Sequence, residues 1–207
     1  MTPIAAVVFD YGGVLTFDPF EGLRDLEKEL RLAPGALCDE FRGGALFREV
    51  ELGRMPLRQF FKAWLTAIEA RHGCVLDLGE TVAAISRGGD ANPAMVELVV
   101  RLHPYRLAIL TNNVRESRAT WEGKVPIERF EVVVDSSEVG LRKPDPAIYR
   151  LLLARLDLEG PAVAYVDDFE ENLPPAAELG MRTVAFTTAE VCEAALAELG
   201  VKVGEPA

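Results

Sequence analysis

The chain has 207 residues, of which 49% are hydrophobic and 27% are charged. This composition is ordinary for a globular protein with a full core, and the length suits one domain, or one domain with a smaller insertion. The net charge of −11 disfavours binding to nucleic acid or to an anionic membrane, because both need a concentrated basic surface. No apolar run approaches the ~20 residues that span a bilayer, and the N-terminus is no secretory signal, so we expect a cytoplasmic protein.

The cysteines and histidines do not form a recognisable framework. Cys38, Cys74 and Cys192 stand far apart without a CxxC pair, and neither His72 nor His103 lies in a zinc-type spacing. This pattern argues against a disulfide framework and excludes a Cys/His metal cluster.

The first predicted element is a buried strand over Ile4–Phe9, and a helical insertion follows it. Residues from about Asp18 to Asn92 contain no strand-like run longer than three residues. Their apolar residues instead predict helices, which are Leu23–Leu32, Gly44–Val50, Leu57–Ala70 and a fourth near Leu78–Ile85. We therefore expect a helical cap at residues 18–91, a candidate lid, and a core made of residues 1–17 and 92–207.

After the cap, helical patterns alternate with short apolar runs. The runs predict strands at Leu107–Leu110, Val132–Val134, Ala162–Val166 and, more weakly, Thr183–Phe186. The helical patterns are Pro93–Leu102, Pro146–Leu156, Pro174–Leu179 and Val191–Leu199. Each strand is continuously apolar, as expected when helices cover both faces of a sheet. The alternation predicts an α/β fold with a doubly wound parallel sheet.

Polar residues follow four of the predicted strands. These segments are Asp10–Thr16, Thr111–Asn113, Gly140–Pro146 and Asp167–Asn172. Each alone has an ordinary explanation as a helix N-cap or a loop. Ligands of open α/β sheets, however, bind at the carboxyl ends of the strands. Together the segments offer carboxylates for a hard cation such as Mg²⁺, a threonine for phosphoryl oxygens and a lysine for charge. They predict a Mg²⁺-assisted hydrolase that acts on a small phosphorylated metabolite, with Asp10 as nucleophile.

The motifs D-x-x-G-V-L-T, T-N, R-K-P-D-P-x-I-Y and D-D-x-x-x-N occur in this order. They resemble the motifs of the haloacid dehalogenase superfamily, and more narrowly those of the subfamily with a helical cap after the first motif. That group includes small sugar-phosphate phosphatases and the phosphatase-like N-terminal domain of soluble epoxide hydrolase. The resemblance covers nearly the whole chain and implies a Rossmann-like core.

The resemblance also implies roles for individual residues. The catalytic residues are Asp10, which attacks phosphorus, Lys143, which offsets negative charge, and Thr111, which binds the phosphoryl group. The metal residues are Asp10, Gly12 through its backbone carbonyl, Asp168 as a ligand, and Asp167 and Asn172, which orient the ligands. Substrate binding is expected at Gly12, Gly13, Thr111 and Asn112. In the cap, Arg42, Arg48 and Glu51 are the polar residues of interest, since an arginine suits a second anionic group.

Gly12 departs from the pattern, because most phosphatases of the superfamily have an aspartate there that acts as general acid and base. Such catalysis contributes typically ~10²–10⁴-fold. One interpretation is a phosphatase whose leaving group needs little protonation, or which takes a proton from water or from Asp18 or Glu171. Another is a haloacid-type dehalogenase, although it would need no Mg²⁺. A third is a binding or sensor protein without turnover. Tyr11 and Phe17, which flank the nucleophile, are candidates for an apolar wall.

Overall fold

A computed structural model, which describes residues 2–121 and 123–205, contains one five-stranded parallel sheet in the order β3-β2-β1-β4-β5. The strands are β1 (Ala6–Phe9), β2 (Arg106–Thr111), β3 (Val132–Asp135), β4 (Val163–Asp167) and β5 (Arg182–Ala185). The register pairs Phe9 with both Ile109 and Val166, so the carboxyl ends of the three central strands lie at one edge. The predicted fold class is confirmed, including its weakest strand.

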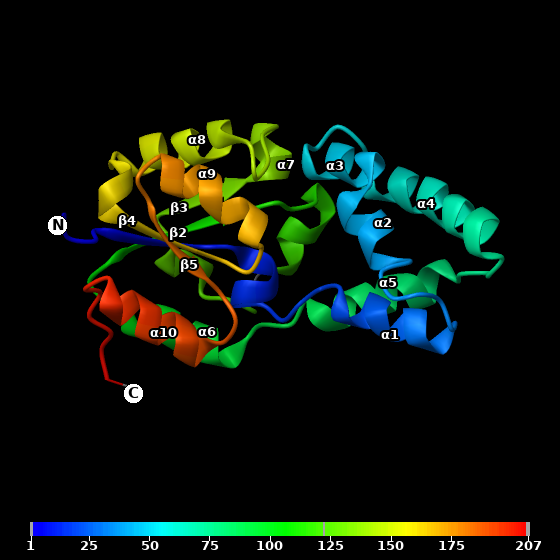
Figure 1. Cartoon of the computed structure of the whole chain (residues 1–207), viewed down its shortest axis with the longest axis horizontal. Coiled ribbons are helices and arrows are strands. Elements are labelled where there is room, and N and C mark those ends of the chain that lie inside the picture. Colours follow the sequence, from blue (N-terminus) through cyan, green and yellow to red (C-terminus); the bar gives the residue numbers. More distant parts are fainter. Residues whose placement is uncertain (1, 122, 206–207) are drawn as a thin grey trace.

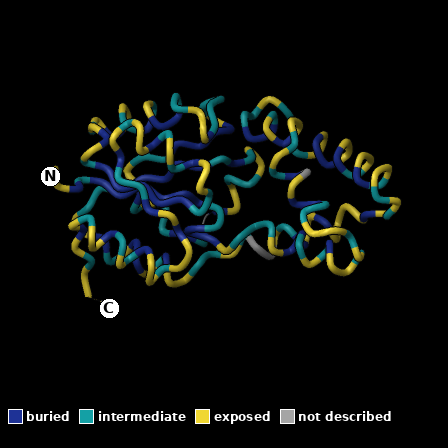
Figure 2. Tube along the Cα trace, viewed as in Figure 1, coloured by how far each residue is buried: buried dark blue, intermediate teal, exposed yellow. Residues whose placement is uncertain are grey.

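Helices cover both faces of this sheet (Figure 1). The core helices are α6 (Pro93–Arg101), α7 (Ser136–Val139), α8 (Pro146–Leu156), α9 (Leu173–Glu178) and α10 (Ala189–Glu198). Successive strand residues point to opposite faces. Val7 and Phe9 pack in the apolar cluster of α6 and α10, whereas Ala6 and Val8 pack in that of α8 and α9. The strands are therefore apolar along their length, and Figure 2 shows them as the buried centre of the core.

Between β1 and α6 the chain forms a separate helical unit, the cap (Figure 1). Its helices are α1 (Glu21–Glu29), α2 (Cys38–Gly43), α3 (Ala45–Glu51), α4 (Leu57–His72) and α5 (Leu78–Gly88). The centre of the cap is aromatic, since the Phe41 ring lies 4.4–5.9 Å from the rings of Phe47, Phe60, Phe61 and Trp64. Even α4, with 16 residues, is not long and apolar enough to cross a membrane, and the same holds for every other described helix.

Two linkers join the cap to the core and run side by side. Thr16 and Ala91 form an antiparallel bridge. The amide of Phe17 donates to the carbonyl of Asp90, and that of Asn92 donates to the carbonyl of Leu15, both at 2.9 Å. Because the chain crosses between the two units at these points, we propose the boundaries at 17/18 and 91/92.

Short turns of three to six residues complete the core and were not predicted. They are η1 (Tyr11–Leu15), η2 (Arg115–Thr120), η3 (Ile127–Arg129), η4 (Gly160–Ala162) and η5 (Glu170–Asn172). Segments of this length are too short to show a hydrophobic period. Two of these turns, η1 after β1 and η5 after β4, carry residues of the candidate site.

Candidate active site

Three adjacent strands deliver polar side chains to the same place. Thr111 and Asp167 are the last residues of β2 and β4. Asp10 follows β1, and its amide donates to the carbonyl of Val166 at 2.9 Å, which continues the pairing of β1 with β4. The three side chains are buried, although their chemistry favours solvent. Such an arrangement requires partners that compensate for the burial.

Lys143 supplies that compensation from the loop before α8. Its Nζ lies 2.6 Å from Asp167 Oδ2 and 3.0 Å from Asp10 Oδ1, and the side chain is 1% exposed. Burial alone would lower the pKa of Lys143, but the two carboxylates outweigh this effect and raise the pKa above its usual value. Asn112 fixes the backbone of Lys143, because its side chain accepts from the Lys143 amide (2.8 Å) and donates to the Lys143 carbonyl (3.0 Å).

Asp167 is held by hydrogen bonds from several directions. Its Oδ1 accepts from the amide of Phe169 at 2.8 Å, and its Oδ2 accepts from the hydroxyl of Tyr165. The Asn172 amide group donates to both oxygens, at 3.0 and 3.1 Å. With Lys143 as a further donor, both oxygens of Asp167 are engaged. Asp167 and Asn172 therefore form a rigid frame behind Lys143.

Asp168 is placed quite differently from its neighbour. Its Oδ1 is buried and has no hydrogen-bond partner among the described residues. Its carboxyl group packs against Gly13, where an added Cβ would come within 2.4 Å of Oδ2, and Gly13 has a φ of +83°. Both the contact and the backbone conformation require glycine at this position. Gly13, predicted to bind substrate, thus makes room for a carboxylate.

One oxygen from each of Asp10, Asp167 and Asp168 lies within 4.8 Å of the others. Burial, followed by repulsion from the other two carboxylates, raises the pKa of Asp168 to about 8. Burial also raises the pKa of Asp10 to about 6, against the opposing effect of Lys143. An unpartnered buried oxygen beside two further carboxylates fits a hard divalent cation such as Mg²⁺, which prefers oxygen ligands and would offset the repulsion.

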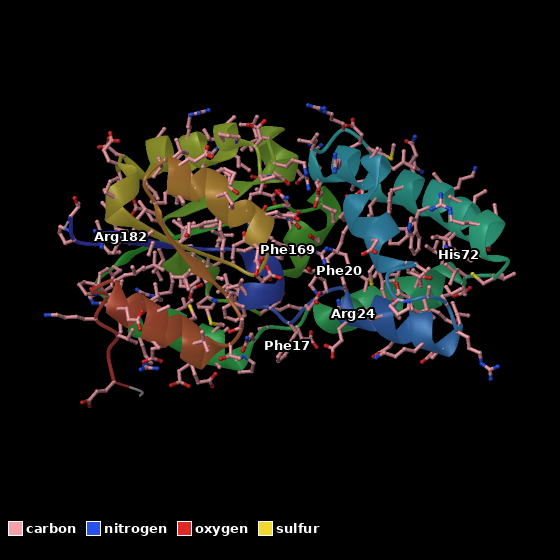
Figure 3. The ribbon with its side chains drawn as sticks, in the orientation of Figure 1. Phe17, Phe20, Arg24, His72, Phe169 and Arg182 are labelled. Carbon is pink, nitrogen blue, oxygen red and sulfur yellow. The ribbon has the colours of Figure 1, made fainter. Side chains whose placement is uncertain are left out.

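A cavity of about 480 Å³ lies between this cluster and the cap. Asp10, Gly12, Thr111 and Lys143 line its core side, and aromatic rings line its cap side. Arg42, the predicted cap residue, also lines the cavity, with its guanidinium carbon 3.9 Å from the centre of the Phe169 ring and 5.2 Å from that of Phe20. Figure 3 shows Phe20 and Phe169 where the cap meets the core.

Some residues considered for this cavity lie elsewhere. Phe17 is 47% exposed and is not among the lining residues, so its prediction as a wall is wrong (Figure 3). Arg48 is exposed and also lies outside the lining. Asp18, considered as a proton donor, is not among the lining residues; its carboxylate binds Arg24 (2.6 Å) and the amide of Phe20 (2.8 Å). These side chains lie on the linker and on the outer surface of the cap. The sequence alone did not distinguish the outer surface of the cap from the surface that lines the cavity.

Other considered residues do line the cavity. The Tyr11 ring stacks on that of Trp121, with ring centres 3.8 Å apart and planes at 11°. Glu171 contributes an exposed carboxylate. Glu51 forms a 2.8 Å ion pair with Arg142 and so links α3 to the loop of Lys143. Sequence reasoning missed Trp121 and Arg142. Arg142 had a signal, because it directly precedes Lys143 in the R-K-P-D-P motif.

A family model described as a haloacid dehalogenase-like hydrolase matches residues 4–180. The chain belongs to this family. Among curated proteins, it is 30% identical to acyl-CoA dehydrogenase family member 10 of Mus musculus, over 97% of the chain and 19% of the relative. It is 27% identical to bifunctional epoxide hydrolase 2 of Sus scrofa, over 87% of the chain and 36% of the relative. The chain thus spans only a minor part of these two relatives. Phosphatase MT3486 of Mycobacterium tuberculosis is 28% identical, over 86% of the chain and 85% of the relative.

Solved structures of haloacid dehalogenase-like hydrolases share the fold. One is a family enzyme from Bacteroides thetaiotaomicron in complex with magnesium and inorganic phosphate, with a TM-score of 0.66 and 21% identity over 89% of this chain and 94% of that chain. Another is L-2-haloacid dehalogenase from Xanthobacter autotrophicus, with a TM-score of 0.64 and 19% identity over 96% of this chain and 84% of that chain. The predicted family, its Rossmann-like core and its helical cap are confirmed.

Proposed function

We propose that this hydrolase releases phosphate from small phosphate monoesters and that it uses Mg²⁺. The observation that carries the proposal is the meeting of Asp10, Thr111 and Lys143 with the unpartnered oxygen of Asp168 at one end of the sheet. Phosphatase MT3486, which aligns along most of its length, and the family structure with magnesium and inorganic phosphate support the same reading of the site.

The proposed metal residues are those that the cluster brings together. Asp10 and Asp168 would hold the ion with their side chains, and Gly12 with its backbone carbonyl. Asp167 and Asn172 would keep this group in place, since Asp167 accepts from both Lys143 and the side-chain amide of Asn172. When bound, Mg²⁺ supplies positive charge that offsets the charge of the phosphoryl oxygens.

In the proposed reaction a carboxylate oxygen of Asp10 forms a bond to phosphorus, and the bond from phosphorus to the ester oxygen breaks. The electron pair of the broken bond leaves with the ester oxygen, which takes a proton from water. Water then cleaves the aspartyl-phosphate and regenerates Asp10. Lys143, charged and fixed beside Asp10, offsets the negative charge that builds up, while Thr111 and the Asn112 backbone amide position the phosphoryl oxygens.

A haloacid-type dehalogenase is the second candidate, and the observation in its favour is Gly12. Attack of Asp10 on carbon would expel a halide, which needs no proton donor at that position. This reaction gives no function to the buried oxygen of Asp168, however. The phosphatase proposal gives that oxygen a cation, so we prefer it.

A panel of phosphate esters, assayed with Mg²⁺ and with a chelator, tests the proposal. We expect Mg²⁺-dependent phosphate release, and its loss in Asp10→Asn, because a neutral amide is a poor nucleophile and a weak ligand. Circular dichroism should show that this nearly isosteric variant is folded. A folded variant that keeps more than a small fraction of the rate would contradict the assignment of Asp10. Halide release from a 2-haloacid without Mg²⁺ would favour the dehalogenase instead.

A further inference from the structure

The walls of the cavity are aromatic and apolar on the side away from the phosphoryl site. Phe41, Phe47 and Phe61 line it from α2, α3 and α4 of the cap, and Val82 and Ile85 line it from α5, which also belongs to the cap. The core adds the stacked pair of Tyr11 and Trp121. A cavity of about 480 Å³ is in the range of small-molecule sites. Its lining favours an apolar group on the substrate, and aromatic walls add edge and face contacts for a ring.

Two cations of the cavity wall, Arg142 and Lys124, already have ion-pair partners. Arg142 is paired with Glu51 at 2.8 Å. Lys124 donates to the carbonyl of Gly89 (2.9 Å) and lies 3.3 Å from Asp90. These ion pairs leave little reason for a second anionic group on the substrate.

Arg42 lines the cavity from the cap, and its guanidinium lies over the ring of Phe169 at 3.9 Å. A planar guanidinium stacks on aromatic faces. Its surroundings therefore suit an aromatic neighbour as well as they suit an anion.

Proton donors for the leaving group are scarce in this cavity. Besides Asp10, the described lining contains two carboxyl groups, those of Glu51 and Glu171. Glu51 is bound by Arg142, and Glu171 is exposed. Gly12, two residues after the nucleophile Asp10, offers no side chain. The ester oxygen must therefore leave without a dedicated acid, which favours an oxygen that is a weak base.

The backbone conformation at position 12 does not require glycine. Its φ of −76° and ψ of 125° are open to any residue. An added Cβ would meet only Pro19, at 3.8 Å, which is an ordinary contact. An acid at this position is thus sterically possible, and its absence is compatible with a substrate that does not need one.

We propose that the site is specific for aryl phosphate monoesters, in which the phosphoryl group is carried by the oxygen of an aromatic ring and the ring fills the cap side of the cavity. This inference rests on the proposed phosphatase function. A phenolic oxygen, with a pKa of about 10 as in tyrosine, is a much weaker base than the oxygen of an aliphatic alcohol. Aryl phosphates thus fit the aromatic walls of the cavity and also have a leaving group that does not need an acid.

Binding of inhibitors that do not react measures the fit of the ring separately from the reactivity of the ester. Phosphonates do not turn over, so inhibition by phenylphosphonate, cyclohexylphosphonate and methylphosphonate can be compared in the Mg²⁺-loaded protein. We expect phenylphosphonate to bind at least about tenfold more tightly than methylphosphonate, because a ring buries apolar area that a methyl group does not. It should also bind more tightly than the cyclohexyl compound. Equal inhibition by all three would overturn the proposal.

Val82→Asp tests whether the ring lies against the cap. Val82 lines the cavity and is 40% exposed, so a polar residue there does not disrupt the core. Val75→Asp is the matched control, because Val75 is 84% exposed and lies outside the lining. We expect Val82→Asp to weaken phenylphosphonate about tenfold and methylphosphonate little. The control should change neither, and equal effects of the two variants would contradict the placement of the ring.

Leaving-group chemistry gives the second test. The kcat/KM of the unmodified protein should be far higher for phenyl phosphate than for cyclohexyl phosphate, and should rise as substituents lower the pKa of the phenol. Gly12→Asp should narrow the gap between the two esters by about tenfold or more, since general acid catalysis contributes typically ~10²–10⁴-fold and helps poor leaving groups most. Equal rates for both esters in the unmodified protein would overturn the aryl specificity while leaving the phosphatase proposal intact. Absence of phosphate release from every ester would instead contradict the proposed function itself.

Discussion

Lys143 separates two carboxylates that would repel each other in a buried site, and the charge of the site depends on it. Its ammonium lies within 3.0 Å of both Asp10 and Asp167. The same charge is most useful where negative charge peaks on the phosphoryl group in the transition state. We therefore predict that Lys143→Met lowers kcat far more than it raises KM. The expected loss is about 3–4 kcal/mol, by analogy with removal of one preorganised donor from an oxyanion site.

Steady-state kinetics on a phosphate ester with saturating Mg²⁺ would measure this effect. Lys62→Met, which removes an exposed lysine from α4, is the control and should behave as the unmodified protein. Thermal unfolding of both variants should accompany the kinetics, since a buried pair that loses one partner costs stability. A rise in KM with unchanged kcat would assign Lys143 to substrate binding alone.

At this scale the sequence predicted which residues meet, but not how they are held. Asp10, Thr111, Lys143 and Asp168 could be selected because they follow strands whose ends converge. The contacts of Asp167 with Tyr165 and Asn172 depend on side-chain positions in the finished core. The tyrosine lies inside an apolar run, where its hydroxyl gives no separate signal.

Among the helices of the cap, α1 is tied to the start of α2 by one carboxylate. Glu27 Oε1 accepts from the amides of Leu37 (2.7 Å) and Cys38 (3.0 Å), and its Oε2 accepts from the amide of Gly35 (3.0 Å). Burial alone would raise the pKa of Glu27, but these hydrogen bonds outweigh it and lower the pKa. The stabilisation is therefore fully present above the usual pKa of glutamate and is lost as the pH falls through the lowered value.

We predict that Glu27→Gln destabilises the cap by about 1–3 kcal/mol, because one amide donor would face the amide of Gly35 and leave it without an acceptor. Glu29→Gln, at an exposed position of the same helix, should have little effect. The chain has two tryptophans, Trp64 in the cap and Trp121 in the core. In a Trp121→Phe background, fluorescence during urea unfolding reports the cap. Equal midpoints for the two glutamate variants would show that Glu27 does not hold this loop.

Long helices were predicted from the sequence more accurately than short ones. The prediction of α8 has the same bounds as the structure, since Pro146 marks its start and four apolar residues recur at helical spacing. The six residues of α2 were missed, although this helix carries Arg42 to the cavity. Its start has no side-chain cap, and its length is less than two turns. Its conformation therefore depends on packing of Phe41 in the cap rather than on a local signal.

For the whole molecule, the clustered carboxylates of Asp10, Asp167 and Asp168, two of them buried and that of Asp168 half-buried, make stability depend on pH and on metal together. Burial raises the pKa of Asp10 to about 6 and that of Asp168 to about 8; the neighbouring carboxylates add to this effect, and Lys143 opposes it. Between the unfolded values near 4 and these raised values, the folded metal-free protein binds more protons than the unfolded chain. Its free energy of unfolding should therefore fall as the pH rises through this window.

Mg²⁺ should reverse this trend, because it binds carboxylates only after they have lost their protons. We predict that the melting temperature with Mg²⁺, minus that with a chelator, is small at pH 5.5 and increases up to pH 8.5. At a hundredfold excess over Kd the gain is about 2.7 kcal/mol, and each kcal/mol raises the melting temperature of a chain of this size by about 2–4 °C.

Asp168→Asn should abolish most of this difference in melting temperature. It should also make the stability of the metal-free protein less sensitive to pH, since it removes the carboxyl group of the cluster with the most strongly raised pKa. Arg106 and Glu131 form an exposed ion pair far along the sheet from these carboxylates, so Glu131→Gln is a control that should keep the difference. A difference that is equal at pH 5.5 and 8.5 would show that Mg²⁺ does not bind through these carboxyl groups.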